Sequence, residues 1–162
     1  MLSKRHALAA SDPYQFQWWA LGLVGARPVE QKKGADKGID GRLLFHDEGP
    51  TKTKQVILSV KAGHTSAPHV RDLRGVVERE GAAIGALIAM QEPTTAPMRR
   101  EAAEAGFYDS PYGGRYPRLQ ILTVGQLLAG ERVKYPHVEG MDATFKKAPR
   151  KGEQHEQKTL EL

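Results

Sequence analysis

The sequence predicts an α/β fold in which helices cover both faces of a mixed central sheet. Three observations predict it. The strongest strand signal, residues 55–61 (QVILSVK), precedes a helical pattern and then a second apolar run, residues 84–90 (IGALIAM). Such a strand–helix–strand step closes as a right-handed parallel crossover. Earlier strands are joined by short polar loops, which favours antiparallel pairing. The second run is apolar at nearly every position, as in a strand covered on both faces.

The first expected element is a helix. Asp12 can cap it, Pro13 suits its first turn, and Gln15 stands where a capping box places Gln or Glu. Apolar residues then recur with the spacing of one helical face until Gly25 ends the pattern. The remaining elements are expected as strands at 27–32, 43–45, 55–61, 84–90 and 119–122, and as helices at 68–80, 94–106 and 123–130. A loop is expected around Tyr108, Tyr112, Gly113 and Gly114.

The chain length of 162 residues suits one domain. We expect an N-terminal extension over residues 1–11, a folded domain over 12–133 and a C-terminal extension over 134–162. Residues 146–162 are charged and almost free of large apolar groups until the end, so this part is expected to be disordered.

Composition excludes several classes of site. Cysteine is absent, which excludes disulfide scaffolds, thiol nucleophiles, iron–sulfur clusters and cysteine-ligated zinc. No apolar run approaches the roughly 20 residues of a membrane span, and the N-terminus lacks a signal-peptide core. We therefore expect a cytoplasmic protein without a membrane partner. The net charge of +5 and the pI near 9.5 permit an anionic partner such as nucleic acid.

One pair of residues can carry chemistry. In the strand at 55–61, Ser59 and Lys61 share a face because side chains alternate. Asp40 lies at the head of the preceding strand, and an antiparallel hairpin can return it to Lys61. A carboxylate can hold Mg²⁺, and a nearby lysine can orient water or neutralise developing charge. The alternative for such a pair is a surface salt bridge.

The pattern Gly38-Ile39-Asp40-Gly41, followed by Ser59-Val60-Lys61, resembles the core of the PD-(D/E)XK nuclease superfamily, and most closely its Mrr-like restriction endonucleases. The resemblance covers about residues 12 to 130. The string from DPYQFQWW through GIDGRL, SVKAG and VRDLRG is also similar to nuclease-like domains attached to site-specific DNA methyltransferases. The resemblance implies an αβββαβ restriction-endonuclease-like core, a Mg²⁺ cofactor replaceable by Mn²⁺, double-stranded DNA as partner, and a homodimer.

The resemblance also implies roles for single residues. Asp40 would be a metal ligand and Lys61 the catalytic lysine. Ser59 occupies a position that is usually Glu, Asp or Gln, so one metal-binding carboxylate is missing there; Ser59 would instead support the site by hydrogen bonding.

The source of the second carboxylate is open among three acids. Glu30 on a neighbouring strand, or Asp72 or Glu78 on the following helix, could supply it; for the two helical acids, ion pairing with nearby arginines is the alternative. Gln17 stands where Mrr-like relatives often place a Glu. Asp36 is expected to support the glycine turn through an Asx-type hydrogen bond. For DNA contact, the candidates are Lys37, Arg42, Arg71, Arg74 and Arg115.

Three functions follow in order of preference. The first is a Mg²⁺-dependent DNA endonuclease of a restriction–modification or DNA-defence system. The second is a catalytically impaired nuclease-like module that binds DNA and works with a DNA methyltransferase in cis or in trans. The third is a purely structural or dimerising domain without affinity for DNA.

Overall fold

A computed structural model describes residues 13–28, 38–90 and 95–136 of the chain. The predicted extension at residues 1–11 and the predicted disorder at 146–162 lie outside these ranges. So do Glu30, Asp36 and Lys37. Within the described ranges, no helix is both long and apolar enough to cross a bilayer.

A five-stranded sheet forms the centre of the fold, in the order β1-β2-β3-β4-β7. Its strands are β1 (Arg27–Pro28), β2 (Gly41–Phe45), β3 (Lys54–Lys61), β4 (Ile84–Ala89) and β7 (Leu119–Thr123). The first three pair antiparallel, whereas β3–β4 and β4–β7 pair parallel. The predicted mixed sheet is therefore confirmed, including the parallel crossover from β3 to β4.

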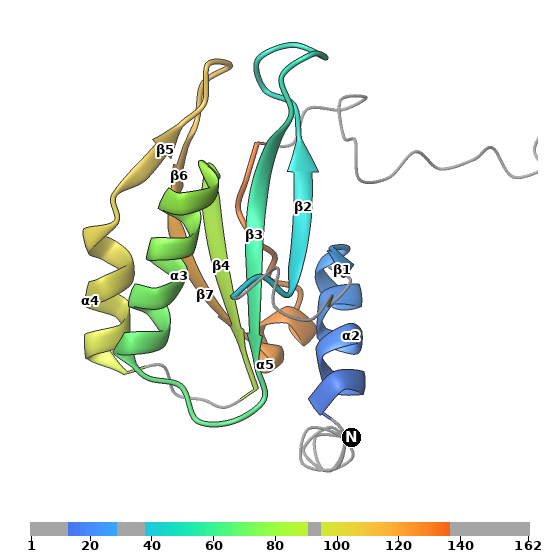
Figure 1. Ribbon diagram of the computed structural model, residues 1–162, viewed down its shortest axis with the longest axis vertical. Helices are drawn as coiled ribbons and strands as arrows, with labels where there is room; N and C mark the ends of the chain where they lie inside the picture. The colour runs from blue at the N-terminus through green and yellow to red at the C-terminus, as the bar shows by residue number, and fades with distance from the viewer. Residues whose placement is uncertain (1–12, 29–37, 91–94, 137–162) are drawn as a thin grey trace, which may run out of the picture.

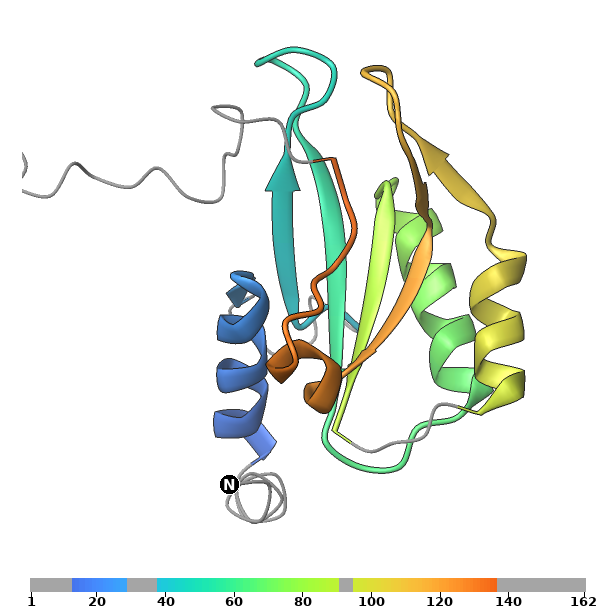
Figure 2. The same ribbon diagram turned by 180° about the vertical axis from the view of Figure 1, so that it is seen from behind.

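Helices cover both faces of this sheet (Figures 1 and 2). On one face lie α2 (Pro13–Val24) and α5 (Val124–Leu128), and on the other lie α3 (Ala67–Glu80) and α4 (Ala96–Glu104). Two buried clusters result. Phe16 of α2 and Leu127 of α5 pack with Leu58 of β3, while Leu73 of α3 packs with Ile57. Alternate residues of β3 thus supply both cores, which explains why the strand is apolar at nearly every position.

Local signals place the helix ends. The side chains of Ser66 and His69 form a capping box at the start of α3, and Gly81 ends this helix in the left-handed conformation at φ 61°. Thr123 and Gln126 form a second capping box at the start of α5.

One segment differs from its prediction. A hairpin of β5 (Phe107–Asp109) and β6 (Arg115–Pro117) occupies the place of the expected loop. Gly113 and Gly114 turn the chain at φ 93° and 94°, and the Ser110 amide donates to the Gly114 carbonyl at 3.0 Å. The strands are three residues each, so their alternation is too short to stand out in the sequence.

Candidate functional site

Asp40 lies immediately before β2 and is hydrogen-bonded to β3. Gly41 pairs with Leu58, so Asp40 stands opposite Ser59. The Asp40 amide donates to the Leu58 carbonyl at 2.9 Å, and the Val60 amide donates to Asp40 Oδ2 at 2.7 Å. The carboxylate therefore holds the turn before β2 against β3.

The two glycines around Asp40 permit this close approach. Gly38 adopts φ +91°, and a Cβ there would lie 2.9 Å from Val76 of α3. At Gly41 a Cβ would lie 2.6 Å from Leu21 of α2. The Gly-x-Asp-Gly pattern thus has a packing reason on both faces of the sheet.

The environment of Asp40 disfavours its charge. Burial raises the pKa of this carboxyl above its ordinary value, because desolvation outweighs three opposing effects: the Val60 hydrogen bond, the Lys61 charge and a hydrogen bond from Gln17. The structure thus brings Gln17, Asp40 and Lys61 together, as the predicted hairpin requires.

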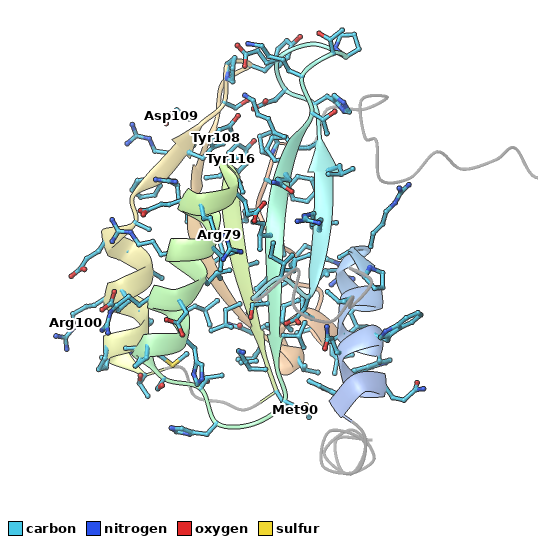
Figure 3. All side chains as sticks on the ribbon, in the orientation of Figure 1. Arg79, Met90, Arg100, Tyr108, Asp109 and Tyr116 are labelled. Atoms are coloured by element: carbon cyan, nitrogen blue, oxygen red, sulfur yellow. The ribbon has the colours of Figure 1, made fainter. Side chains whose placement is uncertain are left out.

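Ser59 and Lys61 occupy the same face of β3. Ser59 is buried at 6% exposure, whereas Lys61 at the end of the strand is partly exposed. The Met90 amide donates to the Lys61 carbonyl at 3.1 Å. Figure 3 labels Met90 and so locates this end of the sheet, opposite the end that carries the β5–β6 hairpin.

The expected second acid is not found beside Asp40 in the part of the chain that the structure describes. Glu78 is exposed on α3, with Oε1 3.3 Å from Arg74 Nε, and Asp72 is exposed on the same helix. None of the groups that shift the pKa of Asp40 is an acid. No set of three His, Asp or Glu side chains suited to a metal ion occurs among the described residues. This donor set does not fit a Mg²⁺ site.

Ion pairs engage the described members of the predicted DNA-binding set. The pairs are Arg42–Glu80 at 4.0 Å, Arg71–Glu101 at 2.7 Å, Arg74–Glu78 at 3.3 Å and Arg115–Asp109 at 2.8 Å. Each guanidinium would exchange a carboxylate for a phosphate on binding DNA. In the Arg74–Glu78 and Arg115–Asp109 pairs both side chains are exposed, and such pairs contribute about 0–1 kcal/mol each, so the exchange is energetically accessible there.

A second Asp–Lys cluster lies at the other end of the β2–β3 hairpin. Asp47 has no solvent exposure, and its Oδ1 lies 2.8 Å from Lys54 Nζ. The Tyr108 hydroxyl donates to Asp47 Oδ2 at 2.6 Å and accepts from Lys54 at 2.7 Å. We call Asp47, Lys54 and Tyr108 the hairpin clasp, because they join the β2–β3 loop to the β5–β6 hairpin; Figure 3 labels Tyr108 on that hairpin.

The hydrogen bonds of the hairpin clasp favour the charged forms of Asp47 and Lys54. Burial alone would raise the pKa of Asp47, but hydrogen bonds from Lys54, Tyr108 and Ser110 outweigh it and lower the pKa. Burial likewise opposes the charge of Lys54, yet its bonds to Asp47, Tyr108 and Glu48 raise its pKa. Sequence reasoning missed the clasp. The Phe45↔Lys54 register would have placed Asp47 near Lys54, whereas the part of Tyr108 depends on tertiary packing.

A family model described as NACHT-associated inactive restriction endonuclease 1 matches residues 14–129. No curated protein and no solved structure matches the chain. The match supports the restriction-endonuclease-like expectation, but neither the Mrr-like group nor the methyltransferase-attached domains in particular.

The match also corrects one expectation. The predicted Mg²⁺-dependent endonuclease activity is wrong, because the family is one of inactive domains. Among the described residues no second acid accompanies the buried Asp40, which agrees with such inactivity. The chain belongs to the NACHT-associated inactive restriction endonuclease 1 family.

Proposed function

We propose that the chain is a non-catalytic, restriction-endonuclease-like module that binds double-stranded DNA without cutting it. One observation carries the proposal: Asp40 serves as an internal hydrogen-bond acceptor for Val60, and no second acid accompanies it among the described residues. The chain thus keeps the scaffold of a nuclease, while its described residues do not complete the donor set for hydrolysis. No step of the proposal passes through a metal ion.

Electrostatics support DNA as the ligand. The chain carries a net charge of +5 with a pI near 9.5. Lys61 is partly exposed at the strand end beside Asp40. Arg71, with a side chain 60% exposed, can reach a phosphate at the expense of one surface ion pair.

The family name suggests the setting in which the module works. Its members are NACHT-associated, and we extend that association to this chain. A NACHT partner thus replaces, in the proposal, the DNA methyltransferase that the sequence suggested. The module would supply DNA contact, while any catalytic step would belong to the partner.

Fluorescence anisotropy of a labelled duplex tests the proposal, with titrations across a salt series. Binding is expected to weaken with salt, with a slope of log K against log salt of about −0.9 for each phosphate contact. Lys61→Ala and Arg71→Ala should each make this slope shallower. Lys52→Ala is the matched control, because Lys52 is an exposed, ion-paired cation in the β2–β3 loop, at the opposite end of the sheet from Lys61.

Two results would overturn the proposal. DNA cleavage in Mg²⁺ or Mn²⁺ that is lost in both Asp40→Ala and Lys61→Ala would refute the non-catalytic assignment. The absence of any duplex binding at low salt would refute DNA as the ligand.

A further inference from the structure

The two edges of the five-stranded sheet differ in their protection. At one edge, β1 has only two residues, Arg27 and Pro28, and both types block further strand pairing. At the other edge, β7 runs for five residues (LQILT) without proline or charge. Figure 2 shows β7 as the strand of this sheet farthest from α2, and none of the described strands pairs with its outer side.

The register shows which backbone groups face outward. Gly85 of β4 pairs with Leu119, and its amide donates to the Arg118 carbonyl at 2.8 Å. In a parallel ladder this places Arg118 and Gln120 toward β4, so Leu119 and Ile121 direct their N–H and C=O groups away from it. Leu119 is almost fully buried, whereas Ile121 is partly exposed. Ile121 is therefore the outward-facing residue of this edge that reaches solvent.

A groove of about 470 Å³ follows this edge. Its lining comprises Pro117, Leu119, Gln120, Ile121, Leu122, Glu131, Arg132 and Lys134. The Gln120 side chain makes two hydrogen bonds with the backbone of Lys134 in the opposite wall. Its Nε2 donates to the Lys134 carbonyl at 2.6 Å, and its Oε1 accepts from the Lys134 amide at 2.8 Å. Arg132 donates to the Leu127 and Glu131 carbonyls at 2.8 Å each. The groove is thus pre-formed, with walls held by hydrogen bonds.

We propose that a second copy of this chain occupies the groove, through antiparallel pairing of the two β7 strands about a twofold axis at Ile121. Each Ile121 amide then donates to the carbonyl of the other copy, and the two apolar side chains lie opposite each other. The sheet continues from one copy into the next, as in an isologous dimer.

The charges of the groove favour a second copy over nucleic acid. Its β7 wall, formed by Leu119, Gln120, Ile121 and Leu122, carries no charge, and the opposite wall carries both signs, Glu131 beside Arg132 and Lys134. A twofold axis brings the walls of the two copies toward each other, so Glu131 of each copy can meet a cation of the other. The proposal gives the expected homodimer an interface and does not depend on DNA binding.

Single-cysteine variants test the proposal directly, because the chain contains no cysteine. A hydrogen-bonded antiparallel pair has Cα atoms about 5.5 Å apart, within the range that a disulfide spans. Ile121→Cys is therefore expected to form a disulfide-linked dimer under mild oxidation. Leu128→Cys is the matched control, because Leu128 is 41% exposed on α5 and does not line the groove; it should remain monomeric on a non-reducing gel.

Sedimentation equilibrium completes the test without a cross-link. The wild-type chain is expected to dimerise, also in about 1 M salt, where a Debye length of about 3 Å suppresses bridging by residual nucleic acid. Ile121→Pro should be monomeric with an unchanged circular dichroism spectrum, because its lost amide points away from β4. A monomeric wild-type chain, a dimer that Ile121→Pro leaves intact, or equal cross-linking of both cysteine variants would each overturn the proposal.

Discussion

Replacing Lys54 by methionine removes the cation of the hairpin clasp while keeping the length of the side chain. Asp47 has no exposed surface, so in Lys54→Met its carboxylate stays buried without its 2.8 Å partner. Tyr108 still donates one hydrogen bond to it at 2.6 Å. The perturbation therefore separates the charge of the clasp from its packing.

The size of the effect follows from burial. Removing one partner of a fully buried ion pair costs about 3–5 kcal/mol. Lys54 is 22% exposed and Tyr108 remains, so about 2–3 kcal/mol is expected here. Small domains have unfolding free energies of about 5–15 kcal/mol, so this loss is a large fraction of the total.

Urea denaturation followed by circular dichroism measures the loss. Arg115→Met is the matched control, since the Arg115–Asp109 pair has the same 2.8 Å separation but side chains 65% and 66% exposed. Its cost should stay below about 1 kcal/mol. The double variant Asp47→Asn with Lys54→Met should recover part of the loss, because no buried charge is left. Equal losses in Lys54→Met and Arg115→Met would refute the argument from burial.

Three further predictions concern pH and packing. Asp40→Asn should raise the melting temperature at neutral pH, because the raised pKa of Asp40 makes the wild-type fold less stable as pH rises from the ordinary value of 3.8 through the folded-state value. The gain in melting temperature should vanish in acid. A difference between the two proteins that does not depend on pH would contradict this reasoning. The pKa of Asp47 is lowered in the folded state, so the ionised clasp stabilises the fold fully above pH 3.8. The stability lost in Lys54→Met should therefore shrink as pH falls through the folded-state pKa of Asp47, which thermal denaturation in acid measures. Gly85→Ala should lower the free energy of unfolding by about 1–3 kcal/mol in urea denaturation, because its Cβ would lie 2.6 Å from Val77. Gly75→Ala inside α3 places a Cβ with nothing within 4 Å and should raise the free energy of unfolding by about 0.5–1 kcal/mol. The opposite order of the two variants would contradict the packing argument.

The elements that the sequence predicts well are those with strong local signals. Strand β3 was expected at 55–61 and spans Lys54–Lys61, and α3 was expected at 68–80 and spans Ala67–Glu80. An apolar run and a capping box encode these boundaries within a few residues. The sequence does not predict the β5–β6 hairpin because its strands of three residues are too short for their alternation to stand out.

The candidate site was predictable in part. The hairpin register that brings Asp40 toward Lys61 follows from the alternation of β3 and the Gly-x-Asp-Gly turn. The sequence does not decide whether Asp72 or Glu78 supplies the second acid, because the direction of these side chains depends on how α3 packs against the sheet. The raised pKa of Asp40 likewise depends on burial, which only the assembled fold supplies.

The β2–β3 hairpin carries an aspartate–lysine pair at each end, Asp40 with Lys61 and Asp47 with Lys54. The first pair lies at the end of β3 where Lys61 is partly exposed, whereas the second joins the buried Asp47 to Lys54 and Tyr108. None of the contacts of the second pair involves Lys61, so a change at this lysine leaves the clasp in place. A lineage built on this hairpin can lose its chemistry and keep its architecture, which leaves a durable scaffold free to acquire a different use.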